Sequence, residues 1–144
     1  MKFMLIVKAD PDSESGRRPD PALLRAMGAY NEALVRAGVL LAAEGLRPSA
    51  QGARVHFDGA ARRVVAGPFP ETEQLVAGFW LIQARSLEEA VEWVKRVPNP
   101  DGLRSQIEIR RVFDAVDFDP AAAAADADPQ RSEPRPADGA ARAH

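Results

Sequence analysis

The chain has 144 residues, a formal net charge of −2, 46% hydrophobic and 28% charged residues, and no cysteine. This profile suits one globular domain and gives no electrostatic argument for binding nucleic acid or an anionic membrane. The lack of cysteine excludes disulfides, thiolate zinc sites and cysteine nucleophiles. The N-terminal apolar run is too short for a signal peptide or a membrane span. We therefore expect a cytoplasmic protein.

The first part of the chain predicts a strand, a helix and a second strand. A compact apolar run predicts a strand at 3–7. Residues 10–20 are expected to form a polar loop. Residues 21–37 predict a helix, because Asp20 is a good N-cap, a proline follows it, and apolar residues recur on one face. A second apolar run predicts a strand at 39–46, stopped by Arg-Pro.

The second part of the chain predicts a hairpin, a strand, a helix and a final strand. Residues 54–57 and 62–65 flank an Asp-Gly dipeptide, which is a strong signal for a β-hairpin. A long apolar run predicts a strand at 77–84. A Ser-Leu-Glu-Glu capping sequence then predicts a helix at 87–97. Alternating apolar and polar residues predict a last strand at 106–113 with one solvated face.

The order β-α-β-(hairpin)-β-α-β indicates an α+β fold of ferredoxin-like plan, an antiparallel sheet with two helices on one face and an inserted β-hairpin. The strand at 3–7 is apolar on both sides, so the other face of the sheet also needs cover. A second copy would provide it, which predicts a homodimer through the sheet faces. The alternative is that the hairpin or the tail covers these strands.

The chain divides into a domain at 1–118 and a tail at 119–144. The tail is rich in alanine and proline and has no large apolar residue. Such a segment cannot bury enough apolar surface to offset the entropy of ordering it, so we expect it to be disordered.

Glu44 and Tyr30 are the candidate catalytic residues. Glu44 lies among apolar residues at a strand end, where burial would raise the pKa of its carboxyl group toward the range useful for acid–base chemistry. A structural alternative is an ion pair with Arg47. Tyr30 lies on the apolar face of the first helix, where core packing is the alternative to a proton-donating role. If both side chains point into the gap between helix and sheet, they form a proton-transfer pair.

A ligand in the same gap would meet apolar walls and a loop with charged residues. We expect the loop at 67–74 to form the pocket rim, with a carboxylate that orients a ligand or caps a turn. The candidate substrate-binding residues are Met4, Ile6, Met27, Pro68, Phe69, Glu71 and Phe79.

The sequence gives no positive signal for a metal or a cofactor. His56 and His144 are far apart and belong to no metal-binding spacing. No serine nucleophile elbow, phosphate-binding glycine loop or dinucleotide fingerprint is present. We therefore expect no cofactor and no metal.

The stretch GPFPETEQLVAGFWLI at 67–82 resembles the DGPF-type signature of YCII-related proteins, whose usual form is close to DGPFAETKELVAGFWL. The segments MKFMLIVK, AGVLLAAEGLRP and SLEEAVEWVKRVP match the same pattern in order and spacing. The resemblance implies a ferredoxin-like fold that dimerises through its sheets, as in dimeric α+β barrels, with a pocket between sheet and helices.

The resemblance also implies two kinds of function. Some relatives are small-molecule enzymes, including a dehydrochlorinase acting on a chlorinated aromatic diol. This suggests a cofactor-independent lyase or isomerase that uses acid–base chemistry on a small, aromatic-like substrate. Many relatives are encoded beside extracytoplasmic-function sigma factors, and the alternative is a non-catalytic regulatory or ligand-binding dimer.

The chain departs from the family pattern at positions where charge would matter. Ala66 replaces the aspartate of DGPF, Glu73 replaces the lysine, and Gln74 replaces the next glutamate. Family members also carry a histidine on the first helix, paired with an aspartate as an acid–base dyad. That dyad does not transfer, because no histidine precedes His56 here.

Overall fold

A computed structural model describes residues 1–119 and 121 of the chain. The chain divides into two compact units, Met1–Val112 and a second that starts at Phe113. The fold below is that of the first unit. Of the tail predicted at 119–144, all but two residues lie outside the described part, so its expected disorder stays a prediction. No described helix has the length and apolar character needed to cross a membrane.

Four strands form one antiparallel sheet in the order β2-β5-β1-β6. The strands are β1 (Lys2–Lys8), β2 (Leu40–Gly45), β5 (Val76–Gln83) and β6 (Ile107–Arg111). With the hairpin set aside, the last strand lies beside the first, and the first lies beside the third. This order confirms the predicted ferredoxin-like plan.

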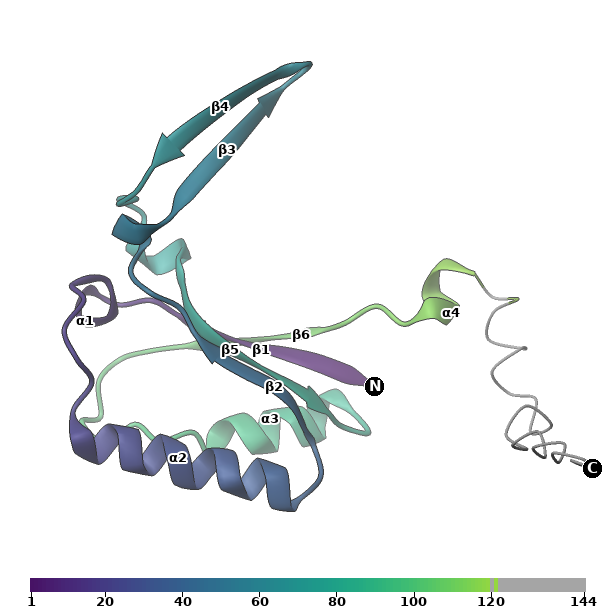
Figure 1. The fold of residues 1–144 in the computed structure, drawn as a ribbon. Helices are drawn as coiled ribbons and strands as arrows, with labels where there is room; N and C mark the ends of the chain where they lie inside the picture. Colours follow the sequence, from purple (N-terminus) through teal and green to yellow (C-terminus); the bar gives the residue numbers. More distant parts are fainter. Residues whose placement is uncertain (120, 122–144) are drawn as a thin grey trace, which may run out of the picture. The chain divides into compact units, whose positions relative to one another are not determined.

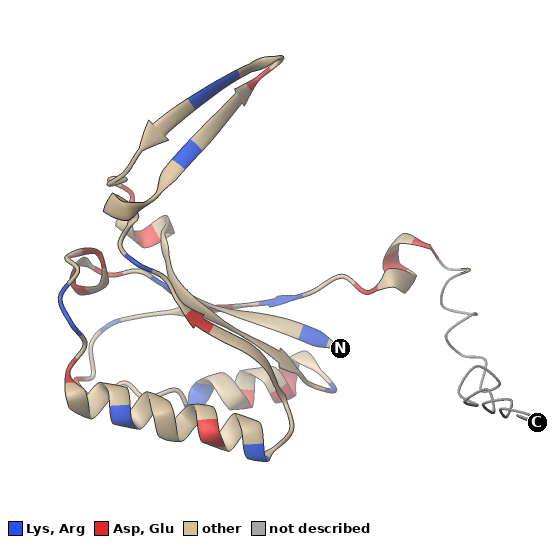
Figure 2. Ribbon diagram, viewed as in Figure 1, with Lys and Arg blue, Asp and Glu red and all other residues tan. Residues whose placement is uncertain are grey.

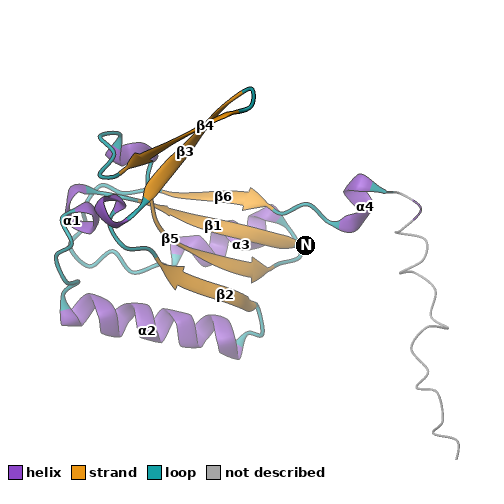
Figure 3. Cartoon of the chain, turned by 45° about the horizontal axis from the view of Figure 1, so that its top comes forward, coloured by secondary structure: helices purple, strands orange, loops and turns teal. Residues whose placement is uncertain are grey.

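Two helices cover one face of this sheet, α2 (Pro21–Arg36) and α3 (Leu87–Lys95) (Figures 1 and 3). The Asp20 side chain caps α2 by accepting a hydrogen bond of 2.7 Å from the Ala22 N–H. Ser86 caps α3 as predicted, by accepting from the Glu89 N–H. The Glu89 carboxylate accepts from the N–H of Arg85 rather than Ser86, so only half of the expected capping box forms.

The hydrophobic core lies between the helices and the sheet. It is built from alternate residues of β1 and β5 and from the inner faces of the two helices, because successive strand residues point to opposite faces. The buried core residues are Phe3, Leu5, Tyr30, Leu34, Trp80, Ile82, Ala84 and Ala90.

The opposite face of the sheet, here called the open face, has a different composition. Cross-strand pairing places Met4 beside Leu81 and Ile6 beside Phe79, and all four side chains are half-buried. On β6, which ends at Arg111, the charged residues Glu108 and Arg110 share this face, as the alternation in the sequence predicted. The open face is therefore apolar at its centre and charged on the β6 side.

The predicted hairpin forms a separate two-stranded sheet, β3 (Ala53–Asp58) paired with β4 (Ala61–Ala66). We call it the hairpin arm. Gly59 has φ 56°, the left-handed conformation that a tight hairpin turn requires. In Figure 1 the arm extends away from the four-stranded sheet. Within the described residues the arm does not join that sheet, and β3 and β4 pair only with each other.

Two four-residue helices were not expected from the sequence. One is α1 (Pro11–Glu14), inside the predicted loop, with a capping box between Asp10 and Ser13. The other is α4 (Ala115–Phe118), in the second unit. The last strand was expected to run to Phe113. It ends at Arg111, and Phe113 is exposed and packs against Phe118 with the two rings tilted.

Candidate functional site

An apolar cleft of about 430 Å³ lies between the first half of α2 and the sheet. Leu23 and Met27 of α2 form one wall, and Ala43 and Trp80 on the helix-facing side of the sheet form another. Gly78 belongs to the same wall. A Cβ there would lie 2.8 Å from the Glu44 carbonyl oxygen, so a side chain at this position would force the two strands apart.

Asn31 is the polar side chain that α2 contributes to the cleft. Its Oδ1 accepts a 2.8 Å hydrogen bond from the indole Nε1 of Trp80. This bond fixes the orientation of the amide. Its Nδ2 makes no hydrogen bond to any described residue, so the cleft contains a positioned donor without a protein acceptor. Asn31 follows Met27 by four residues and so shares its helix face, which is the signal that sequence reasoning missed.

Glu44 and Phe79 also line the cleft and are cross-strand neighbours. The register turns both side chains to the open face, because Trp80, the next residue of β5, points to the helices. Glu44 is exposed, so the burial on which its predicted acid–base role depended is absent. The expected alternative is also not found, because Arg47 donates its hydrogen bond to Gln51.

Tyr30 is a core residue and lies on the other side of the sheet from the Glu44 side chain. Its side chain is 5% exposed, and its ring meets Trp80 edge-on with centroids 5.4 Å apart. Its hydroxyl donates a 3.0 Å hydrogen bond to the Trp93 carbonyl. Burial raises the pKa of Tyr30 to about 12, and the charge of Arg96 offsets this only partly. The proton-transfer pair of Tyr30 and Glu44 is therefore not formed.

The loop at 67–74 contacts the base of the hairpin arm. Arg54 of the arm stacks on the Phe69 ring at 3.9 Å and bonds the Glu71 carboxylate at 3.2 Å. The pKa of Glu71 is lowered by a backbone hydrogen bond and by its bond to Arg54. The Phe69 N–H donates to Ser49 Oγ, which in turn donates to the Glu14 carboxylate. Phe69 and Glu71 thus have structural partners.

Several candidate substrate-binding residues lie away from the cleft. Pro68, Phe69 and Glu71 are absent from its lining, and so are Met4 and Ile6 of the open face. Met27 and Phe79 do line the cleft, together with Glu44. Whether these residues bind a substrate stays a prediction.

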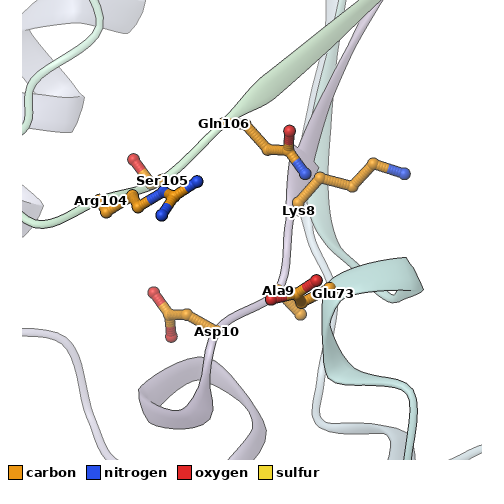
Figure 4. A pocket seen from close by; sticks show the side chains of 7 residues that line it. All are labelled: Lys8, Ala9, Asp10, Glu73, Arg104, Ser105 and Gln106. Atoms are coloured by element: carbon orange, nitrogen blue, oxygen red, sulfur yellow. The ribbon is translucent and has the colours of Figure 1, made fainter.

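A second cavity, of about 420 Å³, is polar. It lies where β1 ends and β6 begins, and Figure 4 shows its side chains around an open centre. Arg104 and Glu73 make no ion pair within the described part of the chain, whereas Lys8 lies 4.0 Å from Glu108. The remaining lining residues are Ala9, Asp10, Ser105 and Gln106. Sequence reasoning missed this cavity because its residues come from three separate segments.

Metal binding has no support in the geometry of residues 1–119 and 121. Within these residues, no three histidine, cysteine, aspartate or glutamate side chains converge as metal ligands. Each cavity can hold a small molecule, but only the cleft combines a large apolar wall with an oriented polar group.

Comparisons with known proteins bear on this site. The YCII-related domain family matches residues 1–116. An uncharacterized protein from Rhizobium meliloti (strain 1021) is 29% identical over 94 residues, which is 65% of this chain and 76% of that protein. Among solved structures, 5-chloro-2-hydroxyhydroquinone dehydrochlorinase (TftG) from Burkholderia phenoliruptrix AC1100, in complex with 2,5-dihydroxybenzoquinone, has a TM-score of 0.47. The two chains are 20% identical, and the similarity covers 78% of this chain and 94% of the dehydrochlorinase.

Proposed function

Because the chain belongs to the YCII-related domain family, we propose that its domain binds a small ring-shaped, aromatic-like molecule in the apolar cleft between α2 and the sheet. The volume of about 430 Å³ lies in the range typical of small-molecule sites. The lining is largely apolar, which favours a ligand with a flat or compact apolar body.

The observation that carries this proposal is the hydrogen bond between Trp80 and Asn31. It holds the Asn31 amide so that Nδ2 remains a donor for a ligand oxygen. A few placed polar groups in an apolar cavity are what give such sites their specificity. A ring bearing a hydroxyl or carbonyl oxygen would satisfy both features.

Catalysis on that ligand would need a base. Glu44 is the one titratable residue among the described residues of the cleft lining, but its side chain points to the open face. A cofactor-independent lyase or isomerase needs a base to remove a proton, and a carboxylate can do this. Tyr30 is not available as the partner acid, since its hydroxyl is buried and bonded. Among the described lining residues no second titratable group meets Glu44, and this favours a non-catalytic, regulatory binding role over turnover.

Ligand binding can be measured through Trp80 itself. Trp93 is the only other tryptophan, so a Trp93→Phe variant makes Trp80 the sole indole reporter. We expect hydroxylated benzenes or benzoquinones to change its fluorescence saturably. In the same background, Asn31→Ala should weaken the affinity for a ring with an oxygen substituent by roughly tenfold, the worth of one hydrogen bond to a ligand.

Glu32→Ala is the matched control, because Glu32 is the next residue of α2 and is exposed. It should leave the affinity unchanged. Equal affinities for the Asn31 and Glu32 variants would contradict the proposed site. Because the Glu44 side chain points to the open face, Glu44→Gln should leave the affinity unchanged. A loss of turnover of a ring substrate in Glu44→Gln, but not in Glu88→Gln on the exposed side of α3, would show that Glu44 acts on the ligand.

We also propose that a second copy covers the open face of the sheet, as expected from the sequence. Four half-buried apolar side chains at its centre support a homodimer through this face. The cysteine-free composition supports a reducing, cytoplasmic setting.

A further inference from the structure

The two faces of the hairpin arm differ sharply. Strand pairing places Val55 opposite Val64 and Phe57 opposite Arg62 on one face, with Ala53 and Ala66 at its base. We call this the apolar face of the arm. The other face carries His56 opposite Arg63. Side chains alternate along a strand, so successive residues of the arm lie on opposite faces.

The apolar face of the arm is open to solvent. Val55 is 47% exposed, Val64 69% and Phe57 71%. The guanidinium of Arg62 lies over the Phe57 ring at 4.5 Å and covers it only in part. A two-stranded ribbon is marginally stable by itself in water, and grouped exposed apolar side chains mark interaction surfaces. The apolar face of the arm therefore has the composition typical of an interaction surface.

The base of the arm is held firmly, so its exposure is not that of a loose loop. Arg54 is bonded to Glu71 and stacked on Phe69. The Gly67 N–H donates a 2.9 Å hydrogen bond to the Gly52 carbonyl. These contacts hold both ends of the arm while its apolar face stays in solvent.

We propose that the apolar face of the arm docks on the open face of the sheet of a second copy, reciprocally in a two-fold dimer. This inference rests on the dimer proposed above and names the element that holds it. Both surfaces are apolar, and the described part of the chain covers neither of them. In a two-fold dimer, one symmetric arrangement covers both arms and both open faces. A second copy of the chain is thus a partner that satisfies both surfaces at once.

Charge supports the same occupant. Figure 2 shows basic residues along both strands of the arm. Of its three arginines, Arg62 lies on the apolar face, opposite Phe57. On the open face, Glu44 makes no ion pair with any described residue. When the apolar face of the arm approaches the β2 side of the partner sheet, its Arg62 meets this carboxylate, which favours the docked arrangement over a random apolar contact.

The oligomeric state of the full-length chain tests this proposal, measured by sedimentation velocity. The unmodified chain should be dimeric, and Phe57→Glu should raise the dimer dissociation constant by at least about tenfold, since it places a charge in the docked surface. The matched control is His56→Glu, which adds the same charge at the adjacent residue on the other face and should leave the dimer intact. Circular dichroism should show the same fold in all three proteins.

Cross-linking tests the contact itself, because the chain has no cysteine of its own. When Phe57→Cys and Met4→Cys chains are mixed under oxidising conditions, they should form a heterodimer that is cross-linked between arm and sheet. Phe57→Cys mixed with Val35→Cys, on the exposed side of α2, should not. A dimer of unchanged affinity in Phe57→Glu would overturn the docked arm but leave the sheet-face dimer standing. A monomeric unmodified chain would overturn both.

Discussion

The indole nitrogen of Trp80 and the side-chain oxygen of Asn31 are 2.8 Å apart, and this hydrogen bond joins the sheet to α2 beside the cleft. Trp80 is 7% exposed, so its N–H has little access to water. The bond therefore serves two purposes. It satisfies a buried donor, and it orients the amide that we propose meets the ligand.

Replacing Asn31 by leucine should destabilise the fold, because the Trp80 N–H is then buried without an acceptor. We expect a loss of about 1–3 kcal/mol in the free energy of unfolding, measured by urea denaturation. Asn31→Asp keeps an oxygen acceptor and should lose less. Equal stability of the leucine variant and the unmodified chain would show that the bond contributes nothing to the fold.

Tyr30→Phe tests the structural role of the buried hydroxyl. The variant loses the bond to the Trp93 carbonyl and should be less stable by about 1 kcal/mol at neutral pH. Ligand affinity in the cleft should not change, since Tyr30 is not in its lining. A large loss of ligand affinity with unchanged stability would show that Tyr30 takes part in ligand binding.

The raised pKa of Tyr30 also predicts an alkaline effect. The group has a pKa of about 12 in the folded chain and 10.0 in the reference state, so the folded chain holds this proton more tightly. The resulting stabilisation is complete below pH 10 and is lost as the pH rises toward 12, by up to roughly 2–3 kcal/mol. The stability difference between the unmodified chain and Tyr30→Phe should therefore narrow and then reverse over this range.

Two glycine-to-alanine substitutions should have opposite effects. A Cβ on Gly67 would overlap the Ser49 carbonyl, so Gly67→Ala must displace the backbone at the base of the arm and should destabilise the fold. Gly28 lies inside α2, and nothing lies within 4 Å of the position that a Cβ would take there. Gly28→Ala should stabilise the fold by about 0.5–1 kcal/mol, since alanine favours the helix. Thermal unfolding of both variants gives the comparison.

Titration of Glu71 should report the contacts at the base of the arm. Its lowered pKa comes first from a backbone hydrogen bond and then from Arg54. Arg54→Gln should therefore raise the pKa only part of the way to its ordinary value, as followed by carboxyl NMR. The stabilising contribution of this carboxylate is present at neutral pH and is lost as the pH falls through its folded pKa. Arg63→Gln, on the same arm, should not change the titration.

Most of the fold could be predicted because each main element carries its own local signal. The N-cap at Asp20, the Asp-Gly turn of the arm and the apolar run of β5 each act within a few residues. The helices α1 and α4 have four residues each, which is too short for any apolar periodicity to appear. Their sequence signals are confined to the first turn: a capping box in each, and in α1 also an Asp-Pro start.

The site was harder to predict because it depends on strand register. The face that Glu44 takes follows from its pairing with Phe79 and from an irregularity between Leu40 and Ala42, neither of which is visible in the sequence. Likewise, the partner of Glu71 is Arg54, 17 residues earlier in the chain. Met27 and Phe79 are among the residues that line the cleft, and whether they bind a substrate stays a prediction.

The central position of β1 has a consequence for how the chain is made. This strand is synthesised before β5 and β6, yet it pairs with both of them, and their residues follow some 70 to 110 positions later. The edge of β1 that pairs with β6 stays without a strand partner until Ile107–Arg111 has been synthesised, whereas the local arm can close early. Such distant pairing slows folding and leaves an apolar strand edge exposed meanwhile. A nascent chain stopped before β6 would therefore be the species most prone to aggregate.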